Sequence, residues 1–282
     1  MTAMVLGWDH ALYPVLRGGR PDGSLSLADL GTDTVVDGLA TAYRRDHGLA
    51  DRQAALTVLH VALGVVRDVL LVPYVVGGVA LEVRADQLAA VVDHDGSPHD
   101  VWVGEIVSVD RDGERLGRDL VRLLAPVSAL VAARAGLRPR AVETVVDDSL
   151  RSTAARLVAR DDVDRPWSSV EVLLRGTGFV PRVSERSVVV RADDGPEVRL
   201  RVPSVCCVLH REPCSGACPT CPQLAEGERV RRTEDWLRAL DEDEFLEVVG
   251  RRRIVDLRDR VAGRTDRGRL VEWSTMQPPP SP

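Results

Sequence analysis

The residues best suited to chemistry in this chain are its cysteines, which all fall in one short segment. The five thiols are Cys206, Cys207, Cys214, Cys218 and Cys221. An odd number of thiols, in a chain that we expect to be cytoplasmic, argues against a disulfide framework. Thiolates gathered this closely repel one another unless a cation neutralises their charge, so the segment predicts a metal site.

Three ligand spacings compete within the segment. The first, Cys214-x3-Cys218-x2-Cys221, is typical of the [4Fe–4S] motif of radical S-adenosylmethionine enzymes. Those enzymes build a barrel after the motif, and the roughly sixty residues that follow Cys221 are too few to form one. We therefore reject this interpretation.

The second spacing is that of a structural zinc site. It consists of two pairs of ligands, and two residues separate the members of each pair. The first pair is Cys207 and His210, and the second is Cys218 and Cys221. Three thiolates and one imidazole satisfy tetrahedral zinc, and such a site would stabilise a non-catalytic module that binds a partner. This set gives no role to Cys206 or Cys214.

The third spacing suits a [2Fe–2S] cluster, in which each iron takes two protein ligands. Neighbouring residues in a strand point to opposite faces, so a vicinal pair can share one cluster only where the strand ends. Pro203 is placed to interrupt the ladder just before that pair. The four thiolates of this set are Cys206, Cys207, Cys218 and Cys221.

The order of these residues resembles a known family. The run Arg201-Val-Pro-Ser-Val-Cys206-Cys207-Val-Leu-His210, followed by Cys218-Pro-Thr-Cys221-Pro, is similar to the Cys-Cys-x10-Cys-x2-Cys motif of FhuF-type ferric-siderophore reductases. The resemblance implies a [2Fe–2S] cluster on Cys206, Cys207, Cys218 and Cys221. It also implies one-electron reduction of a ferric siderophore, with release of Fe(II) in the cytoplasm. Two features depart from the family pattern: Cys214 within the spacer and a long extension after the motif.

The expected partners are a ferric siderophore and an external electron donor, either a ferredoxin, a flavoprotein or a thiol. An internal donor is not expected, because Gly176-Thr177-Gly178 lacks the third glycine of a dinucleotide fingerprint and is read as a simple loop. The net charge of −6 argues against nucleic acid. A transient association with the inner face of the membrane is left open.

Composition narrows the function further. All 37 basic residues are arginine, so Schiff-base enzymes, Walker-type nucleotidases and protein kinases are excluded for want of a lysine. The apolar region from Ala54 to Leu81 is interrupted by His60, Arg67, Asp68 and Pro73. We expect it to be buried core rather than a membrane span, and we find no signal peptide, so a cytoplasmic location is predicted.

The pattern of elements predicts an α+β fold. We expect a mostly helical N-terminal body with a small antiparallel sheet over residues 1–186. A hairpin and [2Fe–2S]-binding segment is expected over 187–224, and a helical extension with a disordered proline-rich tail over 225–282.

Periodicity and capping residues place the individual elements. The first thirty residues are expected to be loop. Thr34 is expected to cap a helix that ends at Gly48, and Pro73 to end a second helix that begins at Asp51. Beyond these we predict strands at Val75–Val83 and Val101–Val109, helices at Glu114–Ala135 and Arg140–Val158, and a hairpin of Ser187–Arg191 with Glu197–Val202.

Other polar or aromatic groups receive structural interpretations. Asp93-His94-Asp95 with His99-Asp100 is interpreted as a polar turn rather than a metal site. Core positions are expected for His60, Trp102 and Trp167. Arg201 and Arg211 flank the cysteines, where they are either solvated or able to attract an anionic chelate.

Overall fold

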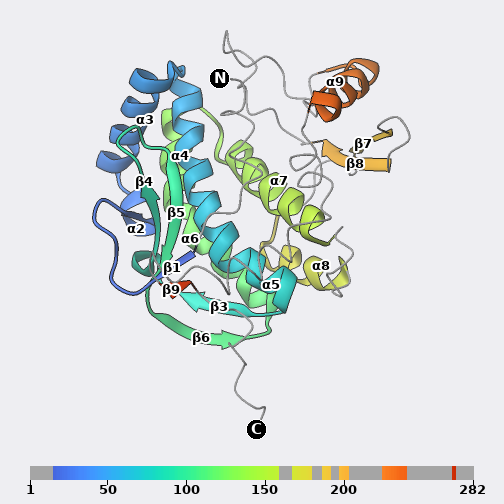
Figure 1. The fold of residues 1–282 in the computed structure, drawn as a ribbon. Helices are drawn as coiled ribbons and strands as arrows, with labels where there is room; N and C mark the ends of the chain where they lie inside the picture. The colour runs from blue at the N-terminus through green and yellow to red at the C-terminus, as the bar shows by residue number, and fades with distance from the viewer. Residues whose placement is uncertain are drawn as a thin grey trace.

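The fold combines many helices with small sheets, which confirms the predicted α+β class (Figure 1). The structure is a computed structural model, and it describes residues 15–158, 167–179, 186–191, 197–202, 224–239 and 269–270. Helix α4 (Asp51–Val66) packs against strands β4 (Leu88–Val92) and β5 (Pro98–Val103) on one side and against α6 (Gly113–Arg134) on another. Helix α6 in turn packs against α8 (Trp167–Gly176), so the described body is layered as sheet, central helix and outer helices.

The larger sheet is mixed rather than purely antiparallel. Its strand order is β2 (Leu25–Ser26), β4 (Leu88–Val92), β5 (Pro98–Val103), β1 (Val15–Arg17) and β9 (Arg269–Leu270). Strands β1 and β5 run parallel, with Val15 opposite Val101, and the other neighbours are antiparallel. Residues 15–30 therefore contribute two strands, where we predicted loop with little regular structure.

A second, two-stranded sheet pairs β3 (Ala80–Val83) with β6 (Ile106–Asp110). The single strand predicted at Val101–Val109 is thus divided between two sheets. The division falls at Gly104, whose amide donates to the Gln87 carbonyl at 2.9 Å. A Cβ at Gly104 would lie 2.1 Å from the Gln87 side chain, so this turn requires glycine. The valine pattern continues across Gly104 and does not reveal the break.

The central helix is longer than predicted. It runs through α4 (Asp51–Val66), a π-helical turn η1 (Arg67–Leu71) and α5 (Val72–Gly77). The prediction that Pro73 ends this helix, with a strand from Val75, is wrong. Pro73 lies in the first turn of α5, just after the π turn changes the hydrogen-bond register, where its missing amide hydrogen is tolerated. Gly78, at φ +71°, ends the helix instead.

The helix from Asp51 to Gly77 is long and apolar enough to cross a membrane by length and composition, yet 94% of its apolar stretch is buried inside the protein. Leu59, Val65, Leu70 and Val75 are each completely buried. This burial confirms the prediction that the apolar region forms core.

Three of the remaining body helices match predicted ones, at Asp33–His47, Gly113–Arg134 and Pro139–Val158, whereas those at Leu27–Leu30, Ala85–Gln87 and Trp167–Gly176 were not predicted. A short helix at residues 27–30 carries a capping box in which Ser26 and Asp29 bond reciprocally, and Thr32 rather than Thr34 precedes the next helix. The predicted end at Gly48 is confirmed by its φ of +67°. These helices are α2 (Leu27–Leu30), α3 (Asp33–His47), η2 (Ala85–Gln87), α6 (Gly113–Arg134), α7 (Pro139–Val158), α8 (Trp167–Gly176) and α9 (Glu226–Ala239).

Helices α6 and α8 touch backbone to backbone through two glycines. A Cβ at Gly117 would lie 2.1 Å from the Leu173 carbonyl, and one at Gly176 would lie 2.1 Å from the Glu114 carbonyl. Gly117→Ala is therefore expected to lower the free energy of unfolding by about 1–3 kcal/mol, because the two helices must move apart. Urea denaturation followed by circular dichroism measures the change.

Gly38→Ala provides the matched control. Gly38 is an exposed position within α3 with no atom within 4 Å of its added Cβ, so alanine is expected to stabilise the protein by about 0.5–1 kcal/mol. Equal effects of the two substitutions would contradict the close α6–α8 contact.

Candidate functional site

The predicted metal ligands lie outside the described residues. Cys206, Cys207, Cys218 and Cys221, together with His210, fall between Val202, where β8 ends, and Leu224, where the described chain resumes. The choice between the two ligand sets therefore stays a prediction. The elements on either side of the segment are described, and they show how its two ends are anchored.

The element before the cysteines is the predicted hairpin, which is confirmed. Strand β7 (Arg186–Arg191) pairs with β8 (Glu197–Val202) in one uninterrupted antiparallel register, from Arg186 opposite Val202 to Arg191 opposite Glu197. The run of valines on β7 and the turn residues Asp193-Asp194-Gly195 in the sequence made this hairpin predictable. Its last residue, Val202, comes four positions before Cys206.

The element after the cysteines packs back onto the hairpin. Helix α9 contacts β7, and Figure 1 shows it beside the two strands and away from β3 and β6. Both ends of the cysteine segment therefore belong to one unit, which we call the hairpin–α9 unit (residues 186–191, 197–202 and 224–239).

Helix α9 buries one positive charge near this end of the segment. Arg229 is only 7% exposed, and its Nη2 donates to the Leu224 carbonyl at 2.6 Å. Thr233, one turn later on the same face, is completely buried. The guanidinium therefore places a positive charge beside Leu224, where the described chain resumes after the cysteines.

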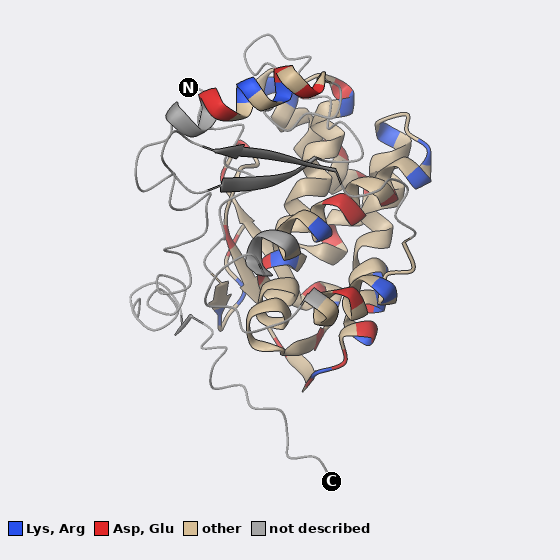
Figure 2. Cartoon of the chain, turned by 90° about the vertical axis from the view of Figure 1, so that its right-hand side faces the viewer, with Lys and Arg blue, Asp and Glu red and all other residues tan. Residues whose placement is uncertain are grey.

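Helix α9 also carries exposed and half-buried side chains of both signs of charge (Figure 2). Glu228 accepts from Arg232 at 2.6 Å and from Arg231 at 2.9 Å. The hydrogen bond from Arg232, followed by that from Arg231, lowers the pKa of Glu228. These exposed pairs stabilise the helix slightly and provide control positions for experiments on Arg229.

The acidic and histidine-rich segment at residues 93–100 forms a polar turn, as predicted. It joins β4 to β5, with the Gly96 amide donating to the Asp93 carbonyl at 2.9 Å and Gly96 at φ +85°. Tyr43 on α3 donates its hydroxyl to the Gly96 carbonyl at 2.6 Å, which fixes the turn against the helix. The backbone amide of Ser97 donates to Asp95, and this bond is the main cause that lowers the pKa of that carboxyl group.

The same turn offers no metal centre. Within the described residues, no group of three or more histidine, cysteine or acidic side chains is placed to hold a metal ion. His99 pairs instead with single carboxylates, its Nδ1 lying 3.6 Å from Asp93 and its Nε2 3.8 Å from Asp100. Its side chain is 44% exposed, as befits a surface group.

The two-glycine fragment Gly176-Thr177-Gly178 forms the end of a helix. It follows the last turn of α8, with the Thr177 hydroxyl donating to the Leu174 carbonyl at 2.7 Å and Gly178 at φ +68°. Dinucleotide phosphates bind at helix N-termini, the opposite end. The interpretation of this fragment as a simple turn is therefore confirmed.

Comparison with protein-family models and with curated proteins found no match to this chain. The resemblance to the FhuF-type reductases therefore depends on the cysteine segment itself, and the function that follows from it is a proposal.

Two buried ion pairs were missed by the sequence analysis. In the π-helical turn, Arg67 Nε donates to Asp68 Oδ1 at 2.6 Å, with both side chains under 10% exposed. On α7, Arg151 Nε donates to both oxygens of Asp147, at 2.8 and 2.9 Å. The π turn η1 packs against α7, so these charges occupy one interior region of the body. The available signal was the pair of opposite charges four residues apart, Asp147 and Arg151, each directly after an apolar residue.

The remaining predicted core residues can be placed in part. Trp102 is 5% exposed, and its indole N–H donates to the Gly18 carbonyl at 3.1 Å, so its core position is confirmed. His60 is partly buried on α4. Arg201 lies on β8, and Arg211 falls outside the described residues.

Proposed function

We propose that this protein is an iron–sulfur oxidoreductase that reduces a ferric siderophore. The observation that carries the proposal is the vicinal Cys206-Cys207 pair placed ten residues before Cys218-x2-Cys221. Four thiolates without an imidazole are the usual donor set of a [2Fe–2S] cluster, so the residues present fit this group. Cys206, Cys207, Cys218 and Cys221 would hold it.

The bound cluster would supply electrons one at a time, which matches the single electron that separates Fe(III) from Fe(II). The hard oxygen donors of a siderophore bind Fe(III) tightly and Fe(II) much more weakly, so reduction releases the metal without cleaving the chelator. The electron comes from an external ferredoxin, flavoprotein or thiol, which is oxidised as the chelated iron is reduced. The reaction would take place in the cytoplasm, where the inner face of the membrane is accessible to the protein.

The hairpin–α9 unit supports this proposal by its position. It anchors the chain on both sides of the cysteines, and the contact of α9 with β7 brings those anchors together. Preorganised ends lower the entropy cost of gathering four ligands around one centre.

The decisive measurement is on anaerobically purified full-length protein. The proposal expects visible sulfur-to-iron absorption and equal amounts of iron and acid-labile sulfide. Protein reduced with dithionite is then mixed with ferric hydroxamate and ferric catecholate chelates, and reoxidation is followed by absorbance. Colourless protein containing only zinc would favour the alternative, a zinc-stabilised partner-binding module held by Cys207, His210, Cys218 and Cys221. A coloured protein that reacts with neither chelate class would be an electron carrier instead.

Arg229 offers a test of the proposed centre within the described residues. A positive charge near the cluster favours its reduced, more negative state, so Arg229→Gln is expected to lower the midpoint potential. Glutamine retains a donor for the Leu224 carbonyl, which Arg229 contacts at 2.6 Å. Redox titration monitored by electron paramagnetic resonance measures the shift.

Two variants control this experiment. Arg229→Lys keeps the charge and is expected to keep the potential, whereas Arg231→Gln removes an exposed charge from the same helix and should change nothing measurable. An unaltered midpoint in Arg229→Gln would show that the buried guanidinium serves only to stabilise α9.

A further inference from the structure

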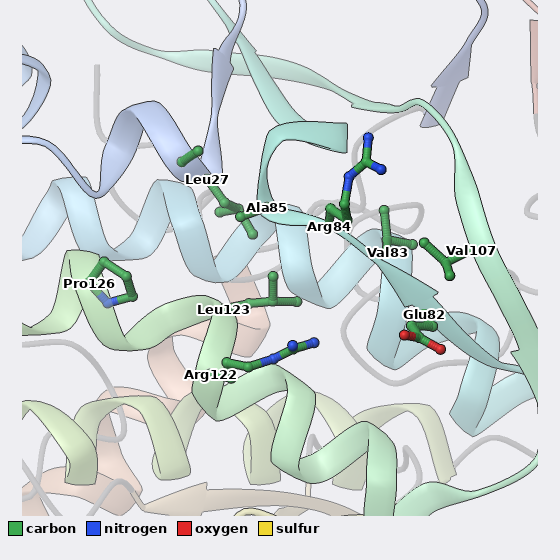
Figure 3. A pocket seen from close by; sticks show the side chains of 10 residues that line it. Leu27, Glu82, Val83, Arg84, Ala85, Val107, Arg122, Leu123 and Pro126 are labelled. Carbon is green, nitrogen blue, oxygen red and sulfur yellow. The ribbon is translucent and has the colours of Figure 1, made fainter.

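A groove of about 400 Å³ lies between α6, α2 and the β3–β6 sheet (Figure 3). Its size is within the range of small-molecule sites. The floor is aliphatic, formed by Leu27, Val83, Val107, Leu123 and Pro126. The groove lies away from the hairpin–α9 unit (Figure 1), so an activity here would be independent of the proposed reductase site.

A β-bulge turns an apolar side chain toward this groove. The pairing of β3 with β6 is irregular between Glu82 and Val83, which leaves Val107 as the extra residue of β6. Val107 is 52% exposed, and no other large hydrophobic residue among those described is exposed. Bulges often redirect a side chain beside a functional site, and an exposed valine continuous with an aliphatic floor provides a contact surface for a ligand.

Glu82 and Arg122 border the same groove with opposite charges, and a series of ion pairs connects them. Glu82 lies 3.8 Å from Arg115, Arg115 lies 2.8 Å from Asp119, and Asp119 lies 2.9 Å from Arg122. Glu82 also accepts the Ser108 hydroxyl at 2.6 Å. The hydrogen bond from Ser108 orients the Glu82 carboxylate before any ligand binds, which reduces the entropy cost of binding, whereas Arg122 is 68% exposed and pairs with Asp119.

These end groups are not paired with each other. Among the ion pairs of the described residues none joins Glu82 to Arg122, although the Arg122 side chain extends toward Glu82 in Figure 3. The third charge on the groove, Arg84, is engaged by Asp86 at 3.2 Å and Glu105 at 3.7 Å. The groove therefore presents one carboxylate and one guanidinium, separated by aliphatic surface.

We propose that the groove binds an apolar zwitterion of dipeptide size. Its ammonium would pair with Glu82, its carboxylate with Arg122, and its aliphatic side chains would cover Leu123 and Val107. A simple fatty acid fits less well, because its apolar chain would take water from the Glu82 carboxylate without replacing the lost hydrogen bonds. An apolar cation would likewise remove water from the Arg122 guanidinium without replacing the lost hydrogen bonds.

Isothermal titration of the full-length protein with the dipeptide Leu-Leu tests this assignment. Binding is expected for Leu-Leu, with affinity about tenfold or more lower in Glu82→Gln and in Arg122→Gln, because each variant removes one charged hydrogen bond. Acetyl-Leu-Leu-amide, which lacks both charges, should bind the parent protein more weakly than the free dipeptide binds either variant. Both side chains are substantially exposed, at 40% and 68%, so the variants are expected to fold normally.

Arg118→Gln serves as the matched control, since Arg118 lies on the same helix, is 58% exposed and pairs with Glu114 outside the groove. It should bind Leu-Leu like the parent protein. Decanoate provides the competing ligand. The proposal is overturned if Leu-Leu gives no binding, if decanoate binds as tightly as Leu-Leu, or if Glu82→Gln binds Leu-Leu unchanged.

Discussion

Replacing Cys206 with serine is expected to remove the bound iron and acid-labile sulfide completely, and with them all reduction of ferric chelates. A [2Fe–2S] cluster needs two protein ligands on each iron, and an alcohol at position 206 is a much poorer donor than a thiolate. His210→Ala is expected to leave iron, sulfide and activity intact, because the imidazole belongs only to the alternative zinc set. Metal analysis measures the bound iron, a sulfide assay measures the acid-labile sulfide, and visible absorption follows the reduction of ferric chelates.

Cys214→Ser is the matched control for this pair of variants. It removes a thiol from the same segment, yet Cys214 belongs to neither ligand set, so metal content should be retained. The reverse pattern, with His210→Ala losing metal and Cys206→Ser keeping it, would establish the zinc site and refute the redox role. The three variants together distinguish a wrong ligand set from a general loss of folding.

Removing one partner of the buried pair on α7 should have the largest effect on stability. Arg151 and Asp147 have side chains only 11% and 9% exposed. Arg151→Met is expected to lower the free energy of unfolding by about 3–5 kcal/mol, because it leaves the Asp147 carboxylate buried without its guanidinium. Chemical denaturation measures the loss.

The double variant Asp147→Leu/Arg151→Met tests the cause of that loss. If the uncompensated charge is responsible, the double variant should recover most of the stability, since apolar residues of similar volume replace a buried pair at little cost. Arg140→Met, at the exposed start of the same helix, should change stability by less than about 0.5 kcal/mol. A double variant as unstable as Arg151→Met would assign the loss to packing.

Local signals sufficed for the elements whose pattern is continuous. Helices α6 and α7 begin within a residue of the predicted positions, because apolar residues recur with helical spacing and Gly136, at φ +60°, follows the end of α6. The central helix was misjudged at Pro73, where the local rule for proline does not foresee a π turn held by complete burial of Val69 and Leu70. Burial belongs to the whole fold and cannot be read from a window of sequence.

The two candidate sites also differ in whether local sequence signals could predict them. The cysteines could be recognised from spacing because all of their proposed ligands lie in one short segment. The groove could not, because Glu82 and Arg122 are brought together by the packing of β3 near α6 and are joined only through Arg115 and Asp119. The buried pair on α7 has a helical spacing, but its seclusion from solvent arises from neighbouring helices.

The contact of α9 with β7 has a consequence for how the protein would tolerate metal loss. Small zinc-dependent modules unfold when the ion is removed, because the metal is their main cross-link. Here the strand pairing and the helix contact already join the two ends of the ligand-bearing stretch, and the body has an extensive apolar interior of its own. Demetallation should therefore remain a local, reversible event, and a chain stripped by a chelator should regain its inorganic centre without having to refold.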